Sequence, residues 1–545
     1  MFIRIVALLS IAFLLHPLHA GSLADLQREA IGEKSSPMAH WGPNPDKYIS
    51  WSSHTNRLIP VYTFGTRGAG EGIDIKNYVE KNSAYRDEDR LRQIYGYVPT
   101  HSVWPMANQM DQTDIYRIQK AALDAGKKHI ILVVFDGMDW HSTRAAAISK
   151  SGRVGYQHGR GTGLFLQEYK ADDTTQFGYM TTSPHNDGTN VDVNNQRVTN
   201  PGGEIRGGYN IARGGATPWD AGSDPLYWIS KSEDANFRHA YTDSSASATS
   251  MTSGIKTYNS AVNVDPTGIP VPTIAHQAQR AGYAVGVVTS VPISHATPAS
   301  SYSHNVSRND YQDLTRDLLG LPSVMHQEPL PGVDVLIGAG WGEEREKDGG
   351  QGENYESGNR YLAPEDLEVI NVDNGGKYVV AIREEGIDGS ERLANAAEKA
   401  VEQGHRLFGF YGADGGHLPY QGAAGDYQPG PGKNNRQSEY SEADIAENVT
   451  LPEMTSAALT VLEKDPEGFW LMIEAGDVDW ANHANNLDAA VGAALAGDEA
   501  IKTAAKWVEE HGGWDGSVMI VTADHGHYLV IDDPSLLIPA EEDGE

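Results

Sequence analysis

The stretch HIILVVFDG, residues 129–137, indicates the fold of this chain of 545 residues. Its unbroken apolar run, Ile130 to Phe135, is typical of a strand buried on both faces of a sheet. The segment before it, DIYRIQKAALDAG at 114–126, has apolar residues at helical spacing and ends at a glycine. Asp136 directly follows the apolar run. The stretch therefore predicts a helix followed by a buried strand, with a carboxylate at the strand's carboxyl end.

The same pattern recurs along the rest of the chain. Buried strands are predicted from the apolar runs at 284–290, 333–340, 469–476 and 517–525, and a helical pattern at 453–465 precedes one of them. Such alternation predicts an α/β fold with a central, mostly parallel sheet covered by helices on both faces.

Carboxylates follow three of these predicted strands, namely Asp136, Glu474 and Asp524. A single loop carboxylate often caps a helix. Ligands of open α/β sheets bind at the carboxyl ends of the strands, however, so three such carboxylates favour a shared metal cluster. The chain has no cysteine, which leaves Asp, Glu, His and hydroxyl oxygens as the available ligands and excludes disulfides.

Composition also predicts an N-terminal signal, a division of the chain into segments and two insertions. Residues 1–20 have the architecture of a signal peptide, so we expect a periplasmic or secreted protein that is soluble and free of the membrane after cleavage. We expect an N-terminal segment at 21–128 and a main domain at 129–545. Irregular composition predicts insertions at about 151–240 and 341–445, the first of them a lid or a flexible surface.

The charge of the chain argues against one class of partner. Forty-two Lys and Arg residues stand against 74 Asp and Glu, a formal net charge of -32. Nucleic-acid-binding proteins usually carry clustered positive charge. We therefore expect no nucleic-acid partner, and we read the acidity as a solvated surface.

The stretch YTDSSASATSMTSGIKTYN, residues 241–259, places Ser244 after Asp243 at a predicted helix start, where backbone N–H groups can face an anion. By itself this stretch reads as a helix cap rich in Ser and Thr. It also resembles the nucleophile motif of the alkaline phosphatases, Asp-Ser-x-x-Ser-Ala-Thr followed by Gly-x-Lys-Thr-Tyr-Asn. The matching positions are Asp243, Ser244, Ser247, Ala248, Thr249, Gly254, Lys256, Thr257, Tyr258 and Asn259.

The resemblance extends from 129 to 527 and implies further roles. Asp136 in FDGM would bridge a zinc and a magnesium ion, and Thr297 in ISHATPAS is similar to the family's magnesium-binding threonine. In the HNVSR run, Arg308 would clamp phosphate, and His304 stands at the family spacing. His295 occupies a position where some members have Asp, which leaves magnesium selectivity open.

The segment EAGDVDWANH continues the resemblance. It implies Glu474 as a magnesium ligand and Asp479 and His483 as ligands of the first zinc. Trp480 replaces the Lys or His of other members, and its pairing with His295 resembles a bacterial subgroup.

The stretch TADHGH supplies the last part of the implied site. Asp524 and His525 would bind the second zinc beside Ser244, with His527 nearby.

One ligand of the first zinc is missing from its usual place. Family members supply it from a His-Thr motif that follows the Asp-His pair toward the carboxyl end, but here a similar motif, His54 and Thr55 before the strand-like LIPVYTF, lies near the front of the chain. We predict a circular permutant of the family's fold, in which His54 is the missing ligand. Termini that lie close together allow such a rearrangement. The alternative is a surface histidine in a truncated chain.

The resemblance implies hydrolysis of phosphate monoesters, with release of inorganic phosphate, through a phosphoserine intermediate on Ser244. Two Zn²⁺ and one Mg²⁺ would be the cofactors, and a homodimer is one assembly that the resemblance allows. A phosphodiesterase or a sulfatase of the same superfamily, or a noncatalytic metal- or phosphate-binding envelope protein, are the alternatives. The Ser-x-x-Ser-Ala-Thr segment with Arg308 favours monoesters. The presence of both Ser244 and Arg308 argues against the noncatalytic protein, because passive metal binding requires neither residue.

Overall fold

The computed structural model describes residues 22–48, 54–220, 222–228, 239–413 and 415–539. The predicted signal peptide at 1–20 lies outside these ranges. A ten-stranded sheet forms the centre of the molecule, in the order β15-β16-β12-β11-β17-β5-β18-β3-β6-β4. Its strands are β3 (Ile59–Phe64), β4 (Met110–Asp111), β5 (His129–Phe135), β6 (Gln176–Thr181), β11 (Ala284–Pro292), β12 (Val335–Ala339), β15 (Tyr378–Ile382), β16 (Arg406–Phe410), β17 (Phe469–Ala475) and β18 (Ser517–Ala523).

The sheet is mostly parallel, as predicted. All neighbours from β15 to β18 run parallel, whereas β3 is antiparallel to both β18 and β6. The five strands predicted from apolar runs correspond to β5, β11, β12, β17 and β18. Every residue of β11, β17 and β18 is buried, which explains why their sequences are apolar without alternation.

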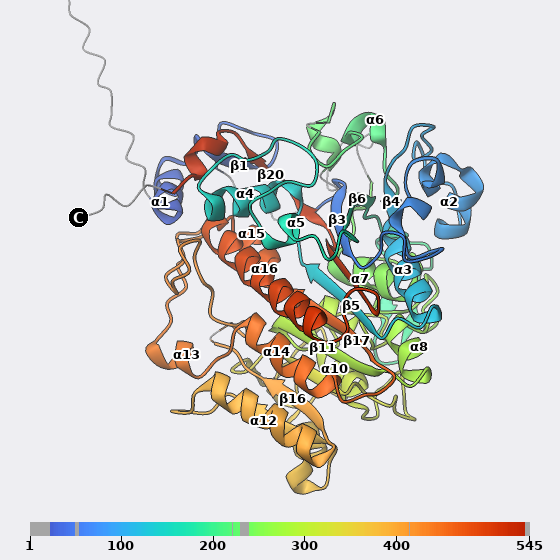
Figure 1. Cartoon of the computed structure of the whole chain (residues 1–545), viewed down its shortest axis with the longest axis vertical. Coiled ribbons are helices and arrows are strands. Elements are labelled where there is room, and N and C mark those ends of the chain that lie inside the picture. Colours follow the sequence, from blue (N-terminus) through green and yellow to red (C-terminus); the bar gives the residue numbers. More distant parts are fainter. Residues whose placement is uncertain (1–21, 49–53, 221, 229–238, 414, 540–545) are drawn as a thin grey trace, which may run out of the picture.

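Helices cover both faces of the sheet (Figure 1). One layer contains α4 (Trp140–Ser151), α12 (Gly389–Gln403), α14 (Leu451–Leu462) and α16 (Leu487–Glu510). The other contains α3 (Gln112–Asp124), α7 (Ser244–Ser253), α8 (Ile274–Arg280), α9 (Ala296–Ala299) and α10 (Tyr311–Leu319). No helix among the described residues combines the length and the apolar character needed to cross a bilayer.

The front of the chain pairs with its end. The short strand β2 (His54–Thr55) is antiparallel to β19 (Gly526–His527), with His54 opposite His527. The strand β1 (Ala39–Trp41) pairs in the same way with β20 (Leu529–Ile531). Together with the β3–β18 pairing, these contacts are the arrangement that the permutation hypothesis requires.

The two predicted insertions need correction, because each contributes strands to the central sheet. The 151–240 segment contains β6, and the 341–445 segment contains β15 and β16. These strands have only five or six residues, and β6 and β15 are partly exposed, so the flanking polar and glycine-rich stretches conceal them. The remainder of 151–240 holds short two-residue strands such as β7 (Asn186–Asp187) and β8 (Val191–Asp192).

Candidate active site

Ser244 is the first residue of helix α7, a position set by its neighbour Asp243. The Asp243 side chain caps the helix by accepting a hydrogen bond from the backbone N–H of Ala246 at 3.0 Å. Ser244 is buried, and its Oγ lies 3.4 Å from Asp136 Oδ1 and 3.3 Å from His525 Nε2. The helix start therefore places a hydroxyl group directly beside a carboxylate and an imidazole.

Asp136, Asp524 and His525 come together because β5 and β18 are adjacent parallel strands. Their carboxyl ends lie at the same edge of the sheet, as predicted. His525 Nε2 lies 3.2 Å from Asp136 Oδ1 and 3.5 Å from Asp524 Oδ2, and all three residues are fully buried. Each residue can thus direct one donor atom, a carboxylate oxygen or an imidazole nitrogen, toward a common ion.

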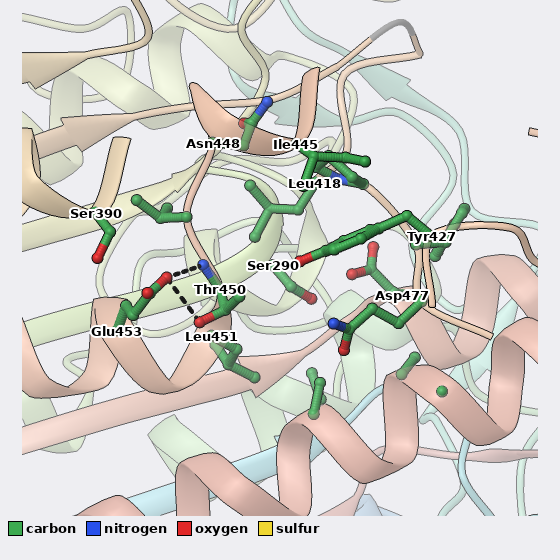
Figure 2. Close-up of a pocket in the computed structure, with 18 of the residues that line it drawn as sticks. Ser290, Ser390, Leu418, Tyr427, Ile445, Asn448, Thr450, Leu451, Glu453 and Asp477 are labelled. Atoms are coloured by element: carbon green, nitrogen blue, oxygen red, sulfur yellow. Dashed lines mark hydrogen bonds between the residues drawn. The ribbon is translucent and has the colours of Figure 1, made fainter. Parts of the chain in front are cut away.

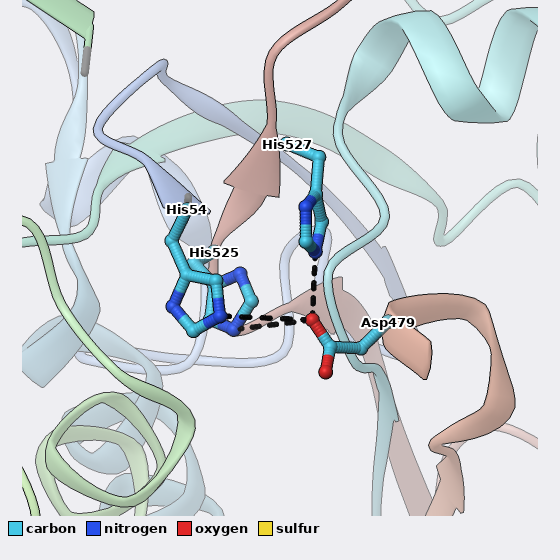
Figure 3. A group of neighbouring side chains, drawn as sticks. All are labelled: His54, Asp479, His525 and His527. Carbon is cyan, nitrogen blue, oxygen red and sulfur yellow. Dashed lines mark hydrogen bonds and ion pairs between the residues drawn. The ribbon is translucent and has the colours of Figure 1, made fainter. Parts of the chain in front are cut away.

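A second group of donors surrounds Asp479, which lies on α15 (Asp477–His483). Asp479 Oδ1 is 2.7 Å from His527 Nε2, 3.4 Å from His483 Nε2 and 3.7 Å from His54 Nε2. Figure 3 shows the rings of His54, His525 and His527 directed toward this carboxylate. The structure therefore brings the predicted N-terminal histidine into the same group as the C-terminal residues.

The backbone orients the His54 ring. His54 Nδ1 lies 3.0 Å from the carbonyl oxygen of Thr242, and a carbonyl can only accept, so Nδ1 carries the proton of the neutral ring. The lone pair on Nε2 then faces Asp479 and the Nε2 of His483, which is 3.2 Å away. Burial, with a smaller effect of His525, lowers the pKa of His54 well below its ordinary value and favours the neutral ring. This is the orientation that metal-binding histidines usually have.

Glu474 and Thr297 form the third part of the site. Thr289, which sequence reasoning missed, donates a hydrogen bond to Glu474 Oε2. Burial raises the pKa of Glu474 to about 8, although Thr289 and Thr297 oppose this shift. The polar end of β11 was the available signal for Thr289, but nothing in its spacing marked it as a partner of Glu474.

The buried carboxylates carry oxygens without a donor. Among the described residues, Asp136 Oδ2, Glu474 Oε1 and Asp524 Oδ2 are buried and accept no hydrogen bond. Burial, reinforced by neighbouring carboxylates, raises the pKa of Asp136 and of Asp524 well above the ordinary range. Asp479 differs. Burial alone would raise its pKa, but the neighbouring His483, His527 and His54 have the larger combined effect and lower the pKa well below its usual value. A cluster of this kind requires cations to offset its charge and to contact its free oxygens.

Arg308 supplies a positive charge at the site, in the cavity that Ser244 also lines. Its Nη1 pairs with Asp243 Oδ2 at 3.0 Å, and its Nη2 lies 3.5 Å from His295 Nε2. Arg308 and His295 line a cavity of about 440 Å³. The residues that line it are His54, Ser244, His295, Arg308, Asp479, Trp480 and His483.

The predicted pairing of His295 with Trp480 is present at this cavity. Their rings meet edge to face with centroids 5.5 Å apart. The ring of His417, a residue that sequence reasoning missed, also meets the Trp480 ring edge to face, with centroids 5.7 Å apart. His417 lies in a glycine-rich stretch with no periodic pattern, so the sequence offered no signal for it.

His304 is the one predicted site residue whose ring contacts lie elsewhere. Its Nε2 is 3.0 Å from the carbonyl oxygen of Val271, its Nδ1 is 3.0 Å from His326 Nε2, and its ring stacks on that of His276. It does not line the 440 Å³ cavity. Its ring turns toward α8 and the loop after α10, and the supporting role predicted for His304 around the site stays a prediction.

A second cavity, of about 190 Å³, adjoins the segment that carries Glu474 and Asp479 (Figure 2). Asp477 lines it together with Ser290 and Tyr427. Asp477 is 8% exposed, its Oδ1 accepts no hydrogen bond from the described residues, and burial raises its pKa well above the usual value. Helix α15 therefore presents carboxylates to two cavities.

Comparison with known proteins identifies one family. The family model described as alkaline phosphatase matches residues 221–537. Alkaline phosphatase 3 of Bacillus subtilis is 30% identical over 285 residues, which are 52% of this chain and 49% of that protein. The alkaline phosphatase of Escherichia coli is 28% identical over 319 residues, which are 55% of this chain and 60% of that protein.

Two solved structures are also similar. The cold-active alkaline phosphatase of a psychrophilic Shewanella sp. is 19% identical, with a TM-score of 0.42 over 73% of this chain and 68% of that one. The alkaline phosphatase of the Antarctic bacterium TAB5 is 20% identical, with a TM-score of 0.42 over 74% of this chain and 80% of that one.

The matched family model covers more than half of the sequence, and the chain belongs to the alkaline phosphatase family. The chain spans about half to three fifths of the length of the curated relatives named above. Asp136 and His54 lie outside the matched range, so their place in the site rests on the contacts described above.

Proposed function

We propose that the protein hydrolyses phosphate monoesters and that Ser244 is the nucleophile. One observation carries the proposal: the hydroxyl group at the start of α7 shares a cavity with the guanidinium of Arg308 and lies 3.4 Å from the Asp136 carboxylate. Membership of the alkaline phosphatase family supports the same reaction class.

We infer that the site would hold two zinc ions and one magnesium ion. Asp136, Asp524 and His525 would hold one zinc, because imidazole and carboxylate groups are ligands that zinc accepts. Asp479, His483 and His54 would hold the other, and the oxygens of Asp136, Thr297 and Glu474 suit magnesium. When bound, such ions neutralise developing negative charge and activate oxygen nucleophiles.

The protein's own residues position the substrate. Arg308, held by Asp243, would donate two parallel hydrogen bonds to phosphate oxygens, and the free N–H groups at the start of α7 would face the same anion. Ser244 Oγ would then attack in line, so that its bond to phosphorus forms as the ester bond breaks and the alcohol leaves. Water hydrolyses the resulting phosphoserine, which releases inorganic phosphate and restores the hydroxyl group.

Parallel assays test the reaction class. We expect wild-type protein to hydrolyse p-nitrophenyl phosphate far faster than bis(p-nitrophenyl) phosphate or p-nitrophenyl sulfate, and Ser244→Ala to lose the monoesterase activity. Ser250→Ala is the matched control, since Ser250 is buried on the same helix and its hydroxyl group donates to the Ala246 carbonyl oxygen, away from the site. Faster diester or sulfate hydrolysis would replace the proposal with one of those activities, and no turnover of any ester by intact, metal-loaded protein would favour a noncatalytic binding protein.

We further propose a periplasmic or secreted location, which rests on the signal-like composition of residues 1–20, and a homodimeric assembly. Cell fractionation with detection of the mature N-terminus tests the first proposal. Light scattering of the purified protein tests the second.

A further inference from the structure

Three more side chains of types that can bind metal ions lie close together outside the cavity described above. His304 lies in the loop that leads to Arg308, Asp317 on helix α10, and His326 in the loop after that helix. One donor atom from each lies within 4.8 Å of the other two. His304 is 5% exposed and Asp317 is fully buried, whereas the His326 side chain is 19% exposed and gives solvent a route to the group.

The hydrogen bonds of His304 fix which nitrogen can bind an ion. Its Nε2 lies 3.0 Å from the carbonyl oxygen of Val271, and because a carbonyl only accepts, this nitrogen carries the proton. In the neutral ring the lone pair is then on Nδ1, which faces His326 Nε2 at 3.0 Å. A ring whose second nitrogen donates to a backbone carbonyl is the usual form of a metal-binding histidine.

Asp317 is held in place by two donors. Its Oδ1 accepts from Ser323 Oγ at 2.7 Å, and its Oδ2 accepts from the backbone N–H of His304 at 2.9 Å. The same Oδ2 lies 3.8 Å from His326 Nε2. Around a tetrahedral ion with metal–nitrogen bonds of about 2.0 Å, neighbouring donors stand about 3.3 Å apart, so these separations need little adjustment.

The neighbouring His276 is excluded as a ligand. Its ring stacks on His304 with centroids 5.1 Å apart, and its Nδ1 accepts a hydrogen bond from the backbone N–H of Thr273 at 3.2 Å. The proton of the neutral ring is therefore on Nε2, which has no lone pair to offer. The donor set is two imidazoles and one carboxylate, and the partly exposed His326 forms its solvent side.

We propose that His304, Asp317 and His326 bind a divalent transition-metal ion of the zinc class at a separate structural site. Two imidazole nitrogens favour such an ion over magnesium or calcium, which prefer oxygen ligands. The ion would tie the loop at 304–308 to α10 and to the loop that follows it. Because Arg308 is four residues from His304 on that loop, the site would brace the phosphate-binding guanidinium without contacting substrate.

Zinc stoichiometry tests the site. After equilibrium dialysis against buffered Zn²⁺, we expect His326→Gln to retain one equivalent of zinc fewer than wild type, and His405→Gln, which changes an exposed histidine elsewhere, to match wild type. The difference between variants does not depend on how many ions the cavity of Ser244 holds. A lack of monoesterase activity would therefore refute the proposed function without bearing on the proposal that His304, Asp317 and His326 bind metal.

A measurement on the unaltered chain guards against misfolding of the variant. Diethylpyrocarbonate modifies accessible imidazoles, and we expect Zn²⁺ to slow the modification of His326 at least tenfold while leaving His405 unaffected. Equal zinc content in wild type and His326→Gln, or modification of His326 at the same rate with and without Zn²⁺, would overturn the proposal. Either result would show that His326 only donates a hydrogen bond to His304.

Discussion

Replacement of His54 by Ala tests the part of the site that joins the two ends of the chain. His54 Nε2 lies 3.7 Å from Asp479 Oδ1 and 3.2 Å from His483 Nε2, so the change would leave the proposed first zinc with two protein ligands. Catalytic zinc sites normally have three. Loss of a residue that merely orients a ligand typically costs about 10- to 100-fold in metal affinity or activity, so we expect loss of a direct ligand to cost at least about 100-fold.

The assay combines zinc analysis with turnover of p-nitrophenyl phosphate at low and at saturating zinc. We expect His54→Ala to lose one equivalent of zinc at low concentration and to regain part of its activity when zinc is raised. His40→Ala is the control, because the His40 side chain is 7% exposed against 12% for His54, lies in the same N-terminal segment and bonds Asp532 instead of the site. Unchanged zinc content and turnover in His54→Ala would refute both its role as a ligand and the permutation hypothesis.

The other predictions concern binding, stability and cofactors. Arg308→Lys removes a bidentate, charge-assisted contact of about 1.5–3 kcal/mol, so kcat/KM for phosphate monoesters should fall about 10- to 150-fold in steady-state assays, and a loss below threefold would contradict the clamp. Lys256→Met leaves the fully buried Asp111, 3.0 Å from Lys256 Nζ, without its cationic partner and should lower the free energy of unfolding by about 3–5 kcal/mol in urea titrations, whereas Lys120→Met at an exposed pair should change it by less than about 1 kcal/mol. Chelation should abolish turnover and added Zn²⁺ with Mg²⁺ should restore it; activity that survives complete removal of metal would contradict the proposed cofactors.

The central strands could be predicted from the sequence because they are buried on both faces. β5, β11, β17 and β18 are mainly apolar without alternation, and such runs are typical of strands in a parallel sheet that is covered on both faces. β6 could not be predicted in this way, since half of its residues are partly exposed and its pairing partners, β3 and β4, lie far away in sequence.

Some residues of the site could be predicted from the sequence and others could not. Asp136 and Asp524 were predictable because both follow apolar strands that end at the same edge of the sheet. Thr289 and Asp477 were not, because a hydroxyl or a carboxylate without a motif gains its role only from the neighbours that folding supplies. The direction of the His304 ring could not be predicted from the sequence either, because it depends on the hydrogen bond between its Nε2 and the carbonyl of Val271.

The most direct test of the proposed function is to trap the covalent intermediate. Wild-type protein incubated with a phosphate monoester would be quenched in acid, digested and analysed by mass spectrometry for phosphorylated peptides. We predict one phosphoryl group on Ser244 in the wild type, none in Ser244→Ala, and the wild-type result in the Ser250→Ala control. Phosphorylation at another residue, or full turnover by Ser244→Ala, would contradict the proposed role of Ser244 as the nucleophile.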